Sequence, residues 1–143
     1  MTTQRTLLLS LRPRFANAIL SGGKTTEIRR RPVNAKPGTP IILYASAPTM
    51  AIVGTARLRA VHICDPDEAW QTHHQTFGLS RTEFDAYLDG SSWAYLLTLT
   101  QVGSLDAPLP LHHLRQDGPF HPPQSFRYVA ATDPASIRDL VPV

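Results

Sequence analysis

Apolar stretches bounded by polar or turn-forming residues divide this sequence into predicted strands. The longest of them alternates between apolar and polar positions, as a strand with one buried face does. The predicted strands cover residues 6–10, 24–31, 40–46, 51–63, 93–102 and 125–130. In the alternating strand, Ile52 and Leu58 are expected to share one face. Arg57 and Arg59 then point to the other face.

Capping and turn residues predict where helices begin between these strands. Pro13 suits the first turn of a helix that the next glycine pair ends. Asp65 and Ser80 are each followed three residues later by glutamate, a pattern typical of helix starts. Pro134 opens a short last helix, and residues ahead of the final strand are predicted to be irregular or a single helical turn.

The order of the predicted elements indicates the fold class. Strands come in runs rather than in strict alternation with helices, which argues against a doubly wound parallel sheet. We therefore expect an α+β fold, a small mixed β-barrel with flanking helices. A length of 143 residues, 42% of them hydrophobic, suits one globular domain that spans residues 1–143.

Composition excludes several classes of protein. No apolar run approaches the roughly 20 residues that a membrane span needs, and no signal peptide is visible. Cys64 is the single cysteine, which excludes an intramolecular disulfide and a multi-cysteine metal cluster. The six histidines show no metal-ligand spacing. We expect a cytoplasmic protein with no metal, no cofactor and no membrane partner.

Charge is distributed very unevenly along the chain. Residues 1–60 hold ten cations and one acid, a net charge of +9, whereas residues 61–143 have a net charge of −6. Twelve of the fourteen cations are arginine, which favours bidentate contacts with phosphate. A GC-rich genome also raises the arginine content, but it does not explain the clustering. The candidate phosphate-binding residues are Arg29–Arg31, Arg57 and Arg59, and the alternative is a solvated charged surface. Since successive strand positions face opposite ways, Arg30 need not join Arg29 and Arg31.

The most informative stretch is a G-x-K-x-x-E-x-R motif over residues 22–29, which contains Lys24, Glu27 and Arg29. A strand and a helix precede it, and the strand ending in Tyr44-Ala-Ser46 follows it. Residues 122–128, Pro-Pro-Gln-Ser-Phe-Arg-Tyr, have the pattern of a closing strand. In these features the chain resembles the ASCH domain family, a branch of the PUA-like barrels, over nearly its whole length.

This resemblance implies a barrel with a cleft between it and the first helix, lined by Lys24, Glu27 and Arg29. Members of the PUA-like group bind RNA or a modified base. Some ASCH branches are hydrolases, including an amidohydrolase that removes the acetyl group from N4-acetylcytidine. That branch has a nucleophilic threonine three residues after the lysine, where this chain has Glu27.

Two interpretations of the motif remain open on chemical grounds. Glu27 is the only acid among ten cations, which favour its charged form. It either pins the strand through a structural ion pair with Arg29 or accepts a hydrogen bond from the exocyclic amine of a base. Lys24 either interacts with the dipole of the preceding helix or serves in a pocket as nucleophile or base, with a lowered pKa.

Other polar residues near the motif, the central strand and the closing strand complete the candidate binding site. Tyr44 is expected to stack on a base or to pack in the core. The remaining candidates are Ser10, Arg12, Ser46, Gln124, Ser125 and Arg127.

The first functional hypothesis is a nucleic-acid-binding module, for RNA, that holds a base or modified nucleoside in the cleft. The second is a small hydrolase, either one that acts on an acylated nucleoside or a ribonuclease that uses Lys24, with Glu27 as proton acceptor. The third is an adaptor whose basic face binds an acidic protein partner.

Overall fold

The computed structural model describes residues 5–140. The strands are β1 (Leu7–Leu11), β2 (Thr26–Arg29), β3 (Pro40–Ala45), β4 (Ala51–Cys64), β5 (Ala94–Pro110) and β6 (Phe126–Tyr128). The helices are α1 (Pro13–Ser21), α2 (Pro66–His73), α3 (Arg81–Tyr87), α4 (Leu111–Leu114) and α5 (Ala135–Arg138), with 3-10 turns η1 (His74–Thr76) and η2 (Arg115–Asp117). The predicted order of strands and helices is confirmed.

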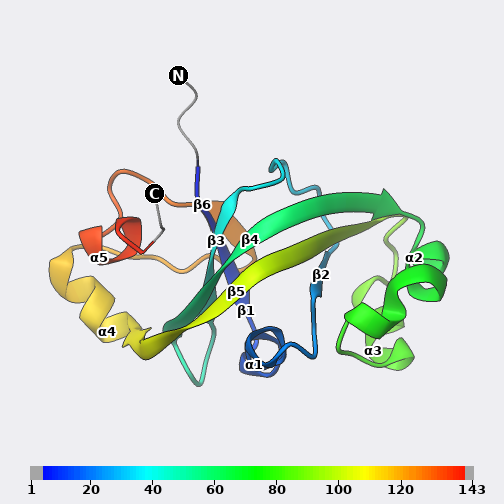
Figure 1. The fold of residues 1–143 in the computed structure, drawn as a ribbon, viewed down its shortest axis with the longest axis horizontal. Coiled ribbons are helices and arrows are strands. Elements are labelled where there is room, and N and C mark those ends of the chain that lie inside the picture. The colour runs from blue at the N-terminus through cyan, green and yellow to red at the C-terminus, as the bar shows by residue number, and fades with distance from the viewer. Residues whose placement is uncertain (1–4, 141–143) are drawn as a thin grey trace.

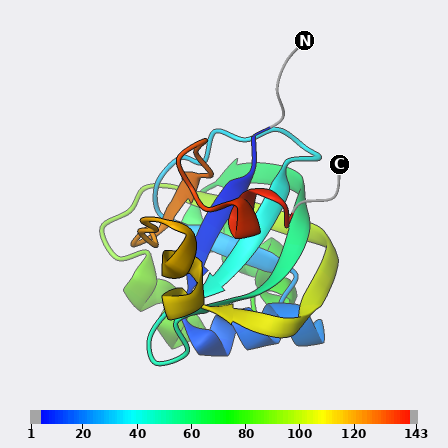
Figure 2. The ribbon, with the colours of Figure 1, turned by 90° about the vertical axis from the view of Figure 1, so that its left-hand side faces the viewer.

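All six strands form one mixed sheet in the order β2-β5-β4-β3-β1-β6. The pair β1–β3 is parallel, and the other neighbours are antiparallel. The sheet curves into a half-barrel, with α4 and α5 at one end and α2 and α3 at the other (Figure 1). Figure 2 shows the strands wrapping around the centre, with α1 below them. The predicted α+β barrel-like fold with flanking helices is therefore confirmed.

Helix boundaries follow the local signals in the sequence. Pro13 stands at the start of α1, and Gly22 ends it in a left-handed conformation, with φ of 90°. The side chain of Asp65 accepts hydrogen bonds from two backbone N–H groups of the first turn of α2. Ser80 and Glu83 form a capping box at the start of α3.

The long pair β4–β5 departs from the predicted regular alternation. Its register shifts three times, and each shift bends the strands and changes which side chains share a face. Ile52 therefore packs in a different core cluster from Leu58, so the prediction that they share one face was wrong. β5 also continues to Pro110, well beyond the predicted end at residue 102.

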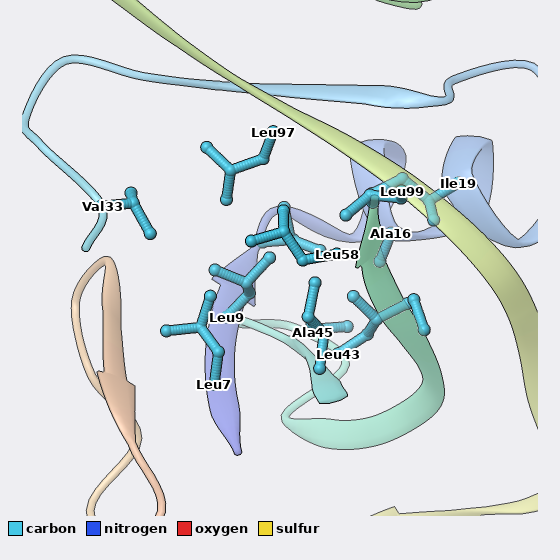
Figure 3. Close-up of a cluster of buried hydrophobic side chains, with 13 residues drawn as sticks. Leu7, Leu9, Ala16, Ile19, Val33, Leu43, Ala45, Leu58, Leu97 and Leu99 are labelled. Atoms are coloured by element: carbon cyan, nitrogen blue, oxygen red, sulfur yellow. The ribbon is translucent and has the colours of Figure 1, made fainter. Parts of the chain in front are cut away.

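Three hydrophobic clusters fix the helices on the sheet. The largest lies between the strands and α1 and contains Leu9, Ile19 and Leu97 (Figure 3). A second joins the opposite face of β1 and β3 to α4 and α5. A third packs α2 and α3 against β2 and the start of β5, through Phe77 and Phe84. In residues 5–140, no helix has the length and apolar character needed to span a membrane.

A close contact between β4 and β5 requires glycine at Gly54. A methyl group added there would lie 2.6 Å from the carbonyl oxygen of Gly103 and 2.6 Å from Cδ2 of Leu20. A methyl group added at Gly103 would meet no atom within 4 Å. The two glycines therefore differ in steric requirement although they lie on paired strands.

We predict that Gly54→Ala lowers the free energy of unfolding by about 1–3 kcal/mol, because overpacking forces the backbone or Leu20 to shift. Gly103→Ala is the matched control and should leave this free energy within about 0.5 kcal/mol of the wild type. Urea unfolding followed by circular dichroism measures both. Equal stabilities of the two variants would contradict the close contact.

Candidate functional site

A cleft of about 1160 Å³ opens where β1, β2, α1, α3 and residues 122–125 meet. Ten of the residues that the sequence singled out line it. They are Ser10, Arg12, Lys24, Glu27, Arg29, Arg31, Tyr44, Ser46, Gln124 and Ser125. These residues come from segments more than a hundred positions apart, so the curvature of the sheet is what brings them together.

Three predicted site residues lie outside the cleft lining. Arg57 is half-buried on β4 and donates a hydrogen bond to the carbonyl oxygen of Gly38 at 2.9 Å. Arg59 is exposed at a register shift of β4. Arg127 forms an ion pair with Asp133, at 2.8 Å, which ties β6 to the segment before α5. Of the predicted phosphate-binding residues, only Arg29–Arg31, at the end of β2 and just after it, line the cleft.

The cleft also contains residues that the sequence did not reveal. Phe15 comes from α1, and Glu83 and Tyr87 come from α3. Arg30, which the sequence placed in the basic run but on the opposite face of a strand, also lines the cleft, because residues 30 and 31 lie beyond the end of β2. No local signal identifies Phe15, Glu83 and Tyr87 as cleft residues, because their place there depends on where α1 and α3 lie in the fold.

Lys24 forms the deepest part of the site and is 1% exposed. Its Nζ donates a hydrogen bond to the carbonyl oxygen of Phe77 at 2.6 Å and lies 3.3 Å from Oε1 of Glu27. The ring of Phe15 lies 5.2 Å from the same nitrogen. Burial lowers the pKa of Lys24, and the nearby Glu27 carboxylate opposes this shift.

Glu27 is 7% exposed and lies between two cations. Its Oε2 accepts a hydrogen bond from Arg29 at 2.6 Å, and its Oε1 accepts one from the backbone N–H of Ile28 at 3.1 Å. The ion pair with Arg29 that the sequence suggested is therefore present. Buried carboxylates need such partners, because an unpaired one pays a large desolvation cost.

Arg29 connects the two open edges of the half-barrel. From β2, its guanidinium donates to the Oγ of Ser125 at 2.8 Å and to the backbone carbonyl of Ser10 at 3.1 Å. Ser10 belongs to β1, and Ser125 directly precedes β6. One planar side chain thus bridges strands that do not pair with each other through their backbones.

Two buried polar atoms at the cleft have no hydrogen-bond partner within residues 5–140. They are Nε of Arg29 and Oγ of Ser10. Buried polar atoms are nearly always paired, and an unpaired one costs about 1–3 kcal/mol. A donor and a hydroxyl left open beside a cleft are therefore suited to a polar ligand.

Charged side chains surround the mouth of the cleft. Arg12, Arg30 and Arg31 are exposed. Arg14 on α1 pairs with Glu83 on α3, with a second contact at 3.0 Å, and so joins the two helices that flank the opening. The hydrogen bonds from Arg14 are the largest cause that lowers the pKa of Glu83 to about 2.

Tyr44 was expected to stack on a base or to pack in the core, and it is 3% exposed. Its ring packs edge-on against Phe120, with centroids 6.2 Å apart, in the cluster under α4. Burial raises the pKa of Tyr44, so its phenol stays neutral near pH 7. Tyr44 therefore has very little surface that a ligand in the cleft could contact.

The His, Cys, Asp and Glu side chains of the described residues are the possible metal ligands and nucleophiles outside the motif. Residues 5–140 contain no group of three His, Cys, Asp or Glu side chains placed to hold a metal ion. Cys64 is partly buried against the third cluster, and burial raises the pKa of its thiol. Its environment favours the unreactive thiol over the thiolate.

Comparison with known proteins identifies the family. The model of the ASCH domain matches residues 9–102. This chain belongs to the ASCH domain family. An ASCH domain-containing ribonuclease from Zymomonas mobilis subsp. mobilis is 32% identical over 123 residues, which cover 85% of this chain and 82% of that protein.

Solved structures agree with this assignment. The crystal structure of ASCH from Zymomonas mobilis has a TM-score of 0.84 and 30% identity, over 90% of each chain. Human THYN1 protein, solved in complex with 5-methylcytosine containing DNA, has a TM-score of 0.50 and 13% identity over 90% of this chain and 92% of its own. The second likeness concerns the fold alone.

We predict that Lys24→Met lowers the free energy of unfolding by about 3–5 kcal/mol, because it removes one member of a buried charge network. The carbonyl of Phe77 loses its donor and Glu27 loses a neighbouring cation. The exposed Arg31→Met is the control and should change stability by no more than about 0.5 kcal/mol. Urea unfolding of both variants measures the difference.

A double variant separates charge pairing from packing. If Lys24 stabilises the fold through Glu27, then Lys24→Met with Glu27→Gln should cost less than the sum of the two single changes. Strict additivity would contradict the pairing.

Proposed function

We propose that this ASCH domain binds single-stranded RNA and holds one nucleobase, plain or modified, in the cleft. The observation that carries this proposal is a buried polar floor, with two unpartnered atoms, beneath a mouth lined by exposed arginines. A base supplies the hydrogen-bonding groups that such a floor lacks. A phosphate backbone supplies the negative charge that such a mouth attracts.

The floor has groups that match the edge of a base. Nε of Arg29 donates, and the hydroxyl of Ser10 donates or accepts. Oε2 of Glu27 accepts one hydrogen bond within the described chain and keeps a second lone pair. A base reaches this depth only after it has left a stack, which favours single strands over duplexes.

The mouth suits the backbone that accompanies such a base. Arg12 and Arg31 have no ion-pair partner within residues 5–140, and the guanidinium of Arg30 lies 5.9 Å from the ring of Tyr87. Exposed guanidinium groups bind phosphate oxygens in a planar, bidentate way. The name of the ribonuclease relative supports a nucleic acid as the ligand class.

We predict that RNA affinity falls steeply with salt, and that Arg30→Gln with Arg31→Gln reduces the slope of log K against log salt. For single strands the slope changes by about 0.7 for each phosphate that the protein no longer neutralises. Arg59→Gln, an exposed cation outside the cleft, is the matched control and should keep the wild-type slope. Calorimetric titration with an oligouridylate at several salt concentrations measures all three. Affinity that does not change with salt would contradict the proposal.

RNA cleavage in the same cleft is a second candidate function, favoured by the relative named a ribonuclease. In this reaction, Glu27 takes the proton of a 2′-hydroxyl, whose oxygen bonds to the adjacent phosphorus. The P–O5′ bond breaks, and the leaving oxygen takes a proton from water, which leaves a cyclic phosphate. Lys24 has no exposed side-chain surface, so we give it a positioning role behind Glu27.

Hydrolysis of an acylated nucleoside fits the cleft less well than cleavage does. Glu27 stands where the hydrolase branch of the family has a threonine. The hydroxyls of the neighbouring Thr25 and Thr26 are not part of the cleft lining, and Thr26 accepts a hydrogen bond from Thr76 at 2.9 Å. Neither threonine hydroxyl therefore takes the place of the nucleophile in the cleft.

We predict that Glu27→Gln lowers cleavage of single-stranded RNA by about 10²–10⁴-fold, the usual contribution of a general base. Retention of RNA should change only a few-fold, because the glutamine amide keeps the size of the side chain. Arg59→Gln, purified in the same way, controls for contaminating nuclease. Mass spectrometry of the fragments reports the cyclic phosphate. Equal cleavage by wild type and Glu27→Gln would contradict this role.

A further inference from the structure

An apolar surface lies beside the cleft, at the ends of β4 and β5. Trp93 is 53% exposed and Ile63 is 62% exposed, the two highest values among the large apolar side chains of residues 5–140. Trp93 directly precedes β5, and Ile63 is the penultimate residue of β4. Neither side chain belongs to the three core clusters. Their exposure therefore has no explanation in the packing of the domain.

Strand register connects this surface to the cleft. Tyr95 on β5 is paired with Arg29 of β2 on one side and with Ile63 of β4 on the other. These three residues form one row across the sheet, and residues in a row share a face. The row passes from the buried site to the surface, since Arg29 is 6% exposed and Ile63 is 62% exposed.

The segments that follow β2 and precede β5 stay close to each other beyond the ends of these strands. Arg30 donates a hydrogen bond to Ser91 at 3.4 Å, so the chain after β2 still runs beside the chain before β5. Arg30 lines the cleft, and Trp93 follows Ser91 by two residues and directly precedes β5. Arg31 also lines the cleft. The segment that carries Trp93 therefore adjoins the arginine-lined mouth.

We propose that Trp93, supported by Tyr95 and Ile63, is a stacking platform for a second nucleobase, next to the base held in the cleft. The phosphate between the two nucleotides then lies against Arg31. This inference rests on the proposed binding of single-stranded RNA. Exposed aromatic rings next to guanidinium groups are how proteins hold successive bases of a single strand without reading their sequence.

The platform explains two features together that a protein partner explains only separately. Cations lie at the cleft end of the row, where Arg29 pairs with Tyr95 and Arg30 contacts Ser91, whereas the acids Asp65 and Glu68 lie near Cys64 at the other end. The row also reaches the cleft, where the proposed first base lies. A strand of RNA that leaves the cleft past Arg31 meets Trp93 next.

The test measures affinity against length, with 2′-fluoro oligouridylates of one to about six nucleotides, which 2′-hydroxyl attack cannot cleave. We expect Trp93→Ala to weaken binding of the longer oligonucleotides by about five- to a hundredfold, the usual effect of losing one stacked base. The mononucleotide should bind within about twofold of wild type, and Trp93→Phe should recover part of the loss. Val102→Ala, an exposed apolar residue elsewhere on β5, is the control.

Tryptophan fluorescence gives an independent readout. Trp70, the other tryptophan, packs among aromatic rings, with centroids 5.2 Å from Phe84 and 4.9 Å from His74. Stacking on Trp93 should quench the emission of the wild type, and Trp93→Phe should bind RNA without this quenching.

Three results would overturn the platform. Trp93→Ala that binds every length as the wild type does would overturn it and leave the proposed function intact. Equal losses for the mononucleotide and the longer oligonucleotides would place the effect in the cleft instead. A wild type that binds no oligonucleotide of any length would overturn both proposals.

Discussion

The guanidinium of Arg29 is the interaction on which the rest of the site depends. A six-stranded sheet that curves into a half-barrel has two edges, β2 and β6, that lie close without backbone pairing. Arg29 bridges this opening through Ser125 and the carbonyl of Ser10, and Glu27 accepts a further hydrogen bond from the same guanidinium. Since the cleft is the space left at this opening, its shape is set by the length and planarity of one side chain. A lysine at this position has no planar fork with which to reach both edges and Glu27 together.

Lys24 extends the same network to the helical end of the molecule. Its ammonium group links the carboxylate of Glu27 to the carbonyl of Phe77, in the connection between α2 and α3. Phe77 packs with Phe84 of α3 in the third cluster, so the position of α3 is coupled to the floor of the cleft. Burying three charges costs more desolvation than it returns in attraction unless each is well paired. The benefit of this network is that it fixes the positions of Lys24, Glu27 and Arg29 at the floor of the cleft.

Local chemistry allowed much of the fold to be predicted, while the site depended on tertiary packing. The caps at Asp65 and Ser80 act within a few residues, so the sequence alone locates them. The shifts of register in β4–β5 depend on pairing between distant segments, which is why the faces of Ile52 and Leu58 were predicted wrongly. The depth of Lys24 also has no local signal, because its hydrogen-bond acceptor, the carbonyl of Phe77, belongs to a segment distant in the sequence. The motif identified which residues meet, but not which of them a ligand touches.

The fold separates the cations of the chain into paired ones and exposed ones at the mouth of the cleft. Within the motif, Lys24 and Arg29 are buried and share Glu27, so three charged groups leave a net charge of +1 at the floor. Acids of the second half neutralise other arginines, as Glu83 does for Arg14 and Asp133 does for Arg127. Within residues 5–140, the cations that form no ion pair near the opening are Arg12, Arg30 and Arg31, and these line its mouth. The attraction for a polyanion is therefore concentrated at the entrance, where water screens it, while the interior is nearly neutral and admits an uncharged base.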